Sequence, residues 1–308
     1  INSMPSAVAQ GLIWGIMAIG VYLTYRILDV ADLTVDGSLG TGGAVCVVMV
    51  LNGVPVGLAL LAATAAGMLA GLVTGLFHTA CGIPAILAGI LTQLALYSVN
   101  LRIMGFGTGG GKANLPISVD KYGLLVSARY VRNVALNNPI LILTIFCAVL
   151  IAVLYWFFGT ELGCSLRATG ANQNMARAQG INTNVTKVLG LMISNGLVAL
   201  AGGLLAQYQG FSDINMGRGA IVIGLAAVII GEVIFSRIFR NFALKLLSAV
   251  IGAIIYYIVM VFVLRLGLST DDLKLLTALV VALFLTIPYW KGKYFTKTSV
   301  KKGEKNHA

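Results

Sequence analysis

The polar stretch GTELGCSLRATGANQNMARAQGINTNVTK, residues 159–187, separates two long apolar blocks, and the rest of the chain is organised around it. Within it, residues 171–180 have the composition of a short helix. Thr169 or Asn172 can cap the start of this helix, and Gly180 can end it in the left-handed conformation that glycine adopts at little cost. A single helix of this length is not stable in water, so the sequence predicts that it packs against a partner.

The composition is that of a polytopic membrane protein. Hydrophobic residues make up 58% of the 308 residues and charged residues only 10%, whereas soluble domains carry about a quarter charged residues. The apolar residues come in blocks of about 20, the length of a helix that crosses a bilayer. The net charge of +11 indicates basic cytoplasmic loops and not a nucleic-acid partner.

We expect an all-α membrane protein of eight or nine transmembrane helices in one domain, residues 1–290, followed by a basic tail, residues 291–308. A long loop, residues 105–138, joins the fourth and fifth spans. The seventh span either crosses the membrane or re-enters it. The candidate spans are residues 6–28, 33–51, 55–77, 83–104, 139–158, 188–209, 217–235, 243–266 and 273–290.

The distribution of basic residues predicts the orientation. If the tail is cytoplasmic, nine spans place the amino terminus outside, and thirteen of the 21 lysines and arginines fall inside. Five of the other eight belong to the fourth span and the long outer loop, and long loops count less in the positive-inside rule. We therefore expect a cytoplasmic carboxyl terminus.

The stretch LDVADLTVDGSLGTGG, residues 28–43, predicts a broken second helix, because glycine costs about 1 kcal/mol at each helix-interior position. Broken helices in membranes line cavities. One interpretation is therefore a segment whose Thr34, Asp36 and Ser38 face a translocation path. The other is an inner loop followed by a glycine-rich packing helix. The three carboxylates of the stretch are Asp29, Asp32 and Asp36.

Glu232 is the only acid in the seventh apolar block. Ionisable groups inside a span usually face the interior of the bundle, which makes Glu232 a candidate for the translocation path. The alternative is a cytoplasmic salt bridge with Arg237 or Arg240, because the expected topology places Glu232 near the inner end of its span.

Small and polar residues in the other spans predict contacts between helices. Gly67, Gly71 and Gly75 recur at every fourth position of the third span and form a face for close helix approach. The polar residues within spans, which we interpret as interhelical hydrogen bonds rather than ligands, are Gln93, Asn100 and Asn195.

The sequence carries no motif of a catalytic or metal site. Residues 108–114, TGGGKAN, depart from the phosphate-binding pattern GxxxxGK[ST], because Phe106 stands at its first glycine and Ala113 at its Ser or Thr. The two histidines belong to no ligand cluster, and no nucleophile is paired with a base. We therefore expect that the chain is not an enzyme and holds no metal or cofactor, so that another subunit would have to bind any ATP.

The central stretch follows the pattern G-x-x-x-R-A-x-G-x-N-x-x-x-A-x-x-x-G-I-N and precedes a span that ends in a glycine-rich segment. In this it resembles the coupling region of ABC importer permeases of the branched-chain amino acid and ribose class. DLTVDGS, residues 32–38, resembles the same class, in particular an uncharacterised branch thought to serve amino acids. The pattern is filled by Gly163, Arg167, Ala168, Gly170, Asn172, Ala176, Gly180, Ile181 and Asn182.

The resemblance implies the transmembrane permease subunit of an ATP-driven, binding-protein-dependent importer of a small solute, with an amino acid as the expected substrate. Two copies of the chain would assemble with two ABC ATPase subunits, which carry ATP and magnesium. An extracytoplasmic solute-binding protein would deliver the solute. The implied location is the bacterial plasma (inner) membrane.

The resemblance also implies roles for individual residues. The helix at 171–180 would be a coupling helix that docks on the ATPase, the alternative being a solvated loop helix. Expected coupling residues are Arg167, Gly170, Asn172, Met175, Ala176, Arg177 and Gly180, with Met175 and Ala176 as an apolar knob. Expected residues of the translocation path are Thr34, Asp36, Ser38 and Glu232. Expected contacts of the binding protein are Asp213, Arg218, Asp271 and Asp272.

Other functions are compatible with the sequence. A secondary transporter driven by an ion gradient would usually carry charged or polar residues near mid-span, and apart from Asp36 and Glu232 the spans offer few. An assembly scaffold would need neither ATP nor a binding protein. Sugars and nucleosides are alternative substrates, and a pair with a paralogue is the alternative to a homodimer.

Overall fold

The computed structural model describes residues 4–106, 110–118, 121–131, 138–235 and 241–265, and eight scattered positions between 275 and 290. The ninth expected span lies largely outside these residues, and the tail lies wholly outside them. The elements are α1 (Met4–Tyr22) with a π-helical continuation η1 (Leu23–Ile27), α2 (Val35–Leu51), α3 (Val56–Thr79), α4 (Ala85–Met104), β1 (Asn114–Pro116), η2 (Ala128–Tyr130), α5 (Pro139–Phe158), α6 (Glu161–Ala171), α7 (Gln173–Ala178), α8 (Thr183–Gln209), β2 (Phe211–Asp213), α9 (Ala220–Phe235) and α10 (Phe242–Arg265).

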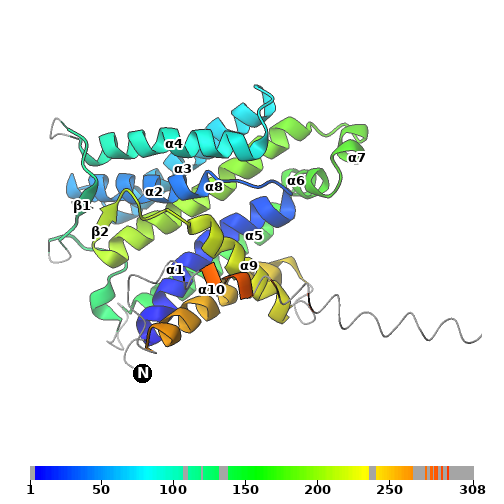
Figure 1. The fold of residues 1–308 in the computed structure, drawn as a ribbon. Coiled ribbons are helices and arrows are strands. Elements are labelled where there is room, and N and C mark those ends of the chain that lie inside the picture. The colour runs from blue at the N-terminus through cyan, green and yellow to red at the C-terminus, as the bar shows by residue number, and fades with distance from the viewer. Residues whose placement is uncertain are drawn as a thin grey trace, which may run out of the picture.

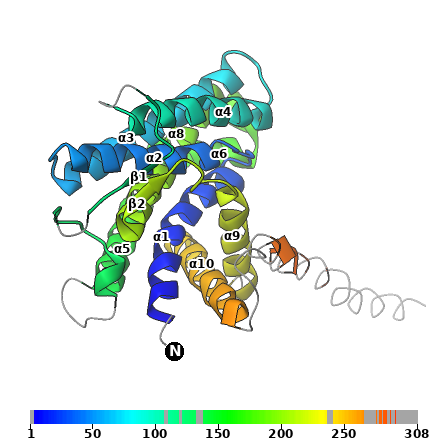
Figure 2. The ribbon, with the colours of Figure 1, turned by 60° about the vertical axis from the view of Figure 1, so that its left-hand side comes forward.

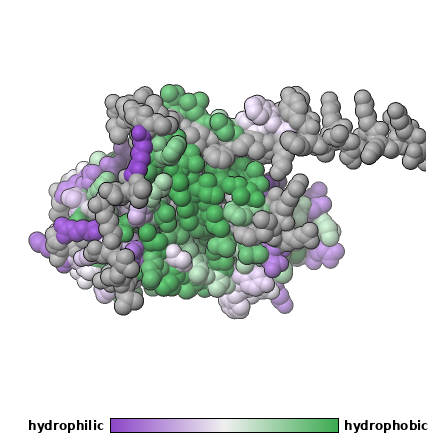
Figure 3. Space-filling view, turned by 90° about the horizontal axis from the view of Figure 1, so that it is seen from below, coloured by the Kyte–Doolittle hydropathy of each residue, from purple (hydrophilic) through white to green (hydrophobic). Residues whose placement is uncertain are grey.

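The all-α membrane architecture is confirmed. Within the described residues, six helices are long and apolar enough to cross a membrane: α1 with η1, α3, α4, α5, α8 and α10. The expected second and seventh spans are shorter apolar helices, α2 with 17 residues and α9 with 16. Figure 3 shows hydrophobic residues across the middle of one face and hydrophilic residues toward both ends, as a bilayer requires.

Two helices form the centre of the bundle. In the most apolar 18 residues of each helix, 89% of the residues of α1 with η1 and 78% of those of α8 are buried, whereas only 17% of those of α5 are. The helix α8 packs against α2 and α3, and α1 packs against α9 and α10. Figure 2 shows these two groups of helices side by side, with α4 on the outside of the first group.

The two ends of the bundle differ in structure. At one end β1 pairs antiparallel with β2, so that Asn114 lies opposite Asp213. At the other end lie α6 and α7 (Figure 1). In the expected topology the strand end is outside and the α6–α7 end is inside.

The glycine face predicted on α3 is confirmed, and its partner is α8. A Cβ atom added to Gly67 would overlap the carbonyl oxygen of Asn195, and one added to Gly71 would overlap that of Leu191. At Gly75 the nearest atom is the Cα of Val188, at 3.0 Å. The absence of side chains therefore lets the two backbones approach along several turns.

The expected break in the second helix is wrong, because α2 runs without interruption from Val35 to Leu51. Its glycines are contact positions: a Cβ atom on Gly42 would overlap the carbonyl oxygen of Ala199 in α8. Close packing outweighs the low helix propensity of glycine here. The irregular backbone is confined to the preceding segment, in which Asp29 has a φ of +53°.

Irregular backbone inside the bundle occurs instead in the connection between α8 and α9, residues 210–219. This connection lies against α2, since a Cβ atom on Gly43 would come within 2.8 Å of the Met216 sulfur and one on Gly217 would overlap the carbonyl oxygen of Asp36. The helix α9 therefore begins beside the first turn of α2 and not at the strand end of the bundle (Figure 1).

Candidate functional site

The short helix predicted in the polar stretch is confirmed as α7. Asn172 ends α6 and caps α7, because its side-chain oxygen accepts hydrogen bonds from the backbone N–H groups of Asn174 and Met175, both at 3.1 Å. Gly180 has a φ of +82° and reverses the chain after the helix. The other predicted cap, Thr169, is buried within α6, and its hydroxyl lies 2.9 Å from that of Thr186 in α8.

Within α7 the structure separates the expected knob residues. The Met175 side chain is 62% exposed, whereas Ala176 is 2% exposed and faces the bundle. The Nε of Arg177 donates a hydrogen bond to the Thr183 hydroxyl at 2.9 Å, which ties α7 to the start of α8. Met175 is therefore the large apolar side chain of α7 that is available to a partner.

Arg167 and Gly170 face the membrane helices and not the tip formed by α7. The Arg167 guanidinium lies over the Phe242 ring of α10, 5.4 Å from its centroid. A Cβ atom on Gly170 would overlap the carbonyl oxygen of Ile27 at the end of η1. These two residues therefore hold α6 against the ends of α1 and α10.

A buried polar network joins the irregular segment before α2 to α8. The side-chain amide of Asn195 donates to Asp32 at 2.7 Å, and its oxygen accepts from the Ser38 hydroxyl at 2.6 Å. The backbone N–H of Thr34 also donates to Asp32, at 2.9 Å. Burial raises the pKa of the Asp32 carboxyl, and its hydrogen bonds with Thr34 and Asn195 act in the opposite direction.

Threonine hydroxyls extend this network across α3 and α4. The Thr34 hydroxyl lies 2.7 Å from that of Thr74, which donates to Thr92 at 2.9 Å. All of these side chains are buried. Thr34 and Ser38 therefore make contacts between helices. Asn195 forms hydrogen bonds to other segments of the bundle, as predicted. No role was predicted for Asp32; its only indication in the sequence is a carboxylate near Thr34 and Ser38 in an otherwise apolar block.

A hollow of about 290 Å³ lies between α2, α4 and the connection before α9. At its edge the Asp36 carboxylate accepts hydrogen bonds from the backbone N–H groups of Gly219 at 3.0 Å and Ile221 at 2.9 Å, and so caps α9. Arg218, which was expected to contact the binding protein, lines the same hollow. The remaining lining residues are Gly37, Gln93, Leu94, Tyr97, Asn100 and Ile214.

Asn100 leaves a polar atom unused in this hollow. Its side chain is 2% exposed, and its amide nitrogen lies 3.5 Å from the carbonyl oxygen of Gly37. Its side-chain oxygen accepts no hydrogen bond from any residue that the structure describes. Since buried polar atoms are usually paired, this oxygen is an unpaired acceptor beside the hollow.

Glu232 forms an ion pair with Arg26 of η1. The Nε of Arg26 donates to the Glu232 carboxylate at 3.0 Å, and a second guanidinium nitrogen contacts the same oxygen. The salt bridge expected near the inner end of α9 therefore exists with a partner from the first span. The sequence-based candidates, Arg237 and Arg240, lie outside the described residues.

The residues expected to contact a binding protein are placed only in part. Asp213 lies in β2 at the strand end of the bundle, where it accepts hydrogen bonds from the Asn114 side chain at 3.4 Å and from the backbone N–H of Asn215 at 2.7 Å. Arg218 follows five residues later, in the hollow. Asp271 and Asp272 lie outside the described residues.

Comparison with known proteins identifies the family. Residues 3–287 match a family model described as branched-chain amino acid transport system, permease component. The chain belongs to this family. The permease is 41% identical, over 92% of its length and 90% of the relative, to the tyrosine transport system permease protein of Clostridioides difficile (strain R20291).

More distant comparisons agree with this result. The permease is 28% identical to the ribose import permease protein of Escherichia coli (strain K12), over 75% of this chain and 69% of that one. Its fold is similar to a chain in the structure of PsaBC from Streptococcus pneumoniae in complex with Fab, with a TM-score of 0.52 and 16% identity. The similarity covers 94% of this chain and 93% of that one.

Proposed function

We propose that the permease is the membrane subunit of an ATP-driven, binding-protein-dependent importer, and that α7 is its coupling helix. The observation that carries the proposal is the geometry of α7, a short capped helix that leaves the bundle and exposes Met175. A helix of six residues gains stability by packing, and a groove on an ATPase would supply that packing.

The proposed assembly contains two copies of this chain, two ABC ATPase subunits and an extracytoplasmic solute-binding protein. ATP and magnesium would be held by the ATPases. The α6–α7 end of the bundle and the carboxyl terminus would face the cytoplasm of a bacterial cell. ATP binding would shift the permease between its states only to the extent that the ATPases bind one state more tightly.

The proposed solute is an amino acid, and the hollow beside Asp36 is its contact site on the translocation path. A free amino acid carries a carboxylate and an ammonium group. The Arg218 guanidinium can donate to the first, and the side-chain oxygen of Asn100 can accept from the second. The name of the tyrosine transport relative supports this substrate class.

Co-purification with the ATPase tests the coupling helix. We expect Met175→Asp to abolish recovery of the ATPase with the detergent-solubilised permease, because a charge would have to be buried in the groove. Leu162→Asp is the matched control, since Leu162 is 56% exposed on the neighbouring α6. A permease that purifies alone and moves solute under an ion gradient without ATP would instead be a secondary transporter.

Uptake kinetics test the hollow. We expect Arg218→Gln to reduce amino acid uptake about 10- to 100-fold, the value of a hydrogen bond to a charged group, while Lys112→Gln leaves uptake unchanged. ATPase recovery stays normal in both variants. If Arg218→Gln weakens only the affinity of the permease for the binding protein, Arg218 is a docking residue. If a sugar or a nucleoside competes with amino acid uptake, the substrate is of that class instead.

A further inference from the structure

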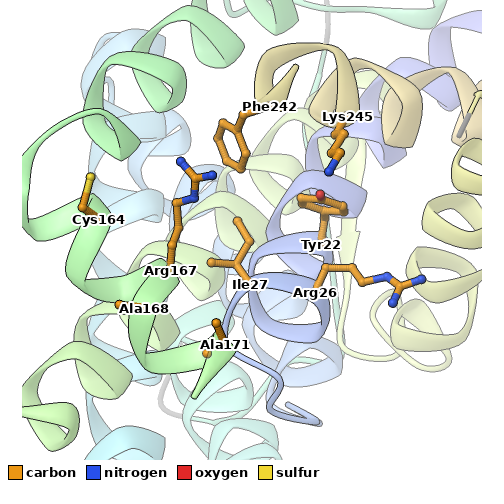
Figure 4. A pocket seen from close by; sticks show the side chains of 10 residues that line it. Tyr22, Arg26, Ile27, Cys164, Arg167, Ala168, Ala171, Phe242 and Lys245 are labelled. Atoms are coloured by element: carbon orange, nitrogen blue, oxygen red, sulfur yellow. The ribbon is translucent and has the colours of Figure 1, made fainter. Parts of the chain in front are cut away.

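A second cavity, of about 560 Å³, opens at the α6–α7 end of the bundle, between the end of α1, α6 and the start of α10 (Figure 4). We propose that this cavity binds the head group of an anionic phospholipid. Its polar lining comes chiefly from Tyr22, Arg26, Arg167 and Lys245, and it adjoins a membrane-facing hollow.

The cavity carries positive charge that the protein does not neutralise. Arg26 is paired with Glu232, and in Figure 4 its guanidinium points away from the centre of the cavity. Arg167 and Lys245 form no ion pair with any acid in the described part of the chain. Figure 4 shows both of these side chains beside the opening, from α6 and α10. Two uncompensated cations favour an anionic ligand.

Tyr22 adds a hydrogen-bond donor to the two cations. Its side chain is 6% exposed, and its ring and hydroxyl are directed into the cavity (Figure 4). Among the described residues, none forms a hydrogen bond with this hydroxyl, which lines the cavity and is free to donate there. A phosphodiester oxygen would provide the missing acceptor.

The neighbouring hollow identifies the rest of the ligand as a lipid. It has a volume of about 440 Å³ and shares Arg167 and Phe242 with the cationic cavity. Its other walls include Tyr155 and Trp156, which are 56% and 70% exposed at the end of α5. Tyrosine and tryptophan concentrate at the membrane interface, and basic pockets between membrane helices bind anionic head groups.

A docked acidic protein would explain less of this arrangement. Its carboxylate would occupy the cationic cavity but leave the aromatic hollow empty, whereas a phospholipid supplies a head group for one and the start of an acyl chain for the other. The coupling helix α7 contributes no residue to either lining. A bound lipid would therefore connect α6 to α10 and hold the base of the coupling region against the membrane.

Native mass spectrometry of the intact permease, with phosphatidylglycerol or phosphatidylcholine added, tests the site. We expect preferential binding of phosphatidylglycerol, reduced about fivefold by Arg167→Gln and again by Lys245→Gln. Tyr22→Phe should also weaken binding while keeping the ring in place. Arg102→Gln, an exposed cation at the far end of α4, is the control and should leave binding unchanged.

Two further measurements decide between sources of the anion. Trp156→Ala should weaken phosphatidylglycerol binding, and inorganic phosphate should not displace the lipid. Equal binding of the two lipids, or equal binding to the wild type and to the Arg167→Gln, Lys245→Gln double variant, would overturn the proposal. Displacement of the lipid by phosphate alone would also overturn it. If the double variant loses ATPase recovery but keeps its lipid binding, the two cations contact the ATPase and not a lipid.

Discussion

At the scale of single residues, Asn195 is the junction of the buried polar network. Its amide donates to Asp32 and to the carbonyl oxygen of Leu191, at 2.7 and 3.0 Å, and its oxygen accepts from Ser38 at 2.6 Å. One side chain thus satisfies a buried carboxylate and a buried hydroxyl from two different segments. Removing it would leave the buried Ser38 hydroxyl without this acceptor and the buried Asp32 carboxylate with only its hydrogen bond from Thr34.

We therefore expect Asn195→Leu to lower the free energy of unfolding by about 1–3 kcal/mol, the cost of unsatisfied buried polar groups. Thermal unfolding of the detergent-purified permease measures the effect. Asn184→Leu, at an exposed position in the first turn of the same helix, should change the unfolding temperature little. Equal unfolding temperatures for the two variants would show that the network does not contribute to stability.

At the scale of elements, the contact between α3 and α8 depends on glycine. We expect Gly71→Ala to destabilise the protein by about 1–3 kcal/mol, because the new methyl group would overlap the carbonyl oxygen of Leu191. Gly57→Ala, in the first turn of α3, is the matched control, since no atom lies within 4 Å of the added Cβ. Thermal unfolding of both variants separates close packing from helix propensity, and a stabilised Gly71→Ala protein would contradict the packing argument.

The cap of α7 is a second property of an element. Asn172→Ala removes the acceptor for two backbone N–H groups and should cost about 1 kcal/mol of local stability. Hydrogen exchange of the amides in residues 173–181 should then be about fivefold faster. Asn174→Ala, two residues later and exposed, is the control and should leave exchange unchanged. If the amides stay protected in Asn172→Ala, α7 is held by packing alone.

At the scale of the whole molecule, two natural cysteines report the orientation. Cys81 and Cys164 are exposed, whereas Cys46 and Cys147 are buried. Cys81 lies between α3 and α4, and Cys164 lies in α6, so the proposed topology places both inside the cell. A membrane-impermeant maleimide should therefore label neither in intact cells and both after permeabilisation. Lys112→Cys, in the loop at the opposite end, should be labelled from outside, and labelling of Cys164 from outside would invert the topology.

The sequence alone determined the features that depend on neighbouring residues or on a simple period. Asn172 and Gly180 bound a short helix because capping acts over two or three residues. The glycines of α3, four residues apart, lie on one face of any helix, so their close contact could be predicted without knowing the partner. The apolar blocks likewise predicted membrane helices from their length.

Only the tertiary structure decided which distant residues meet. Arg26 and Glu232 are 206 positions apart, and Asp36 reaches α9 only because the chain turns back into the bundle after α8. The hollow at Arg218 and Asn100 depends on the same turn. The break predicted from the glycines of α2 was wrong, because helix propensity is a local energy, whereas these glycines allow close contact with α8. Helix packing in lipid depends on shape at contacts between remote segments, and a linear pattern does not encode which segments those are.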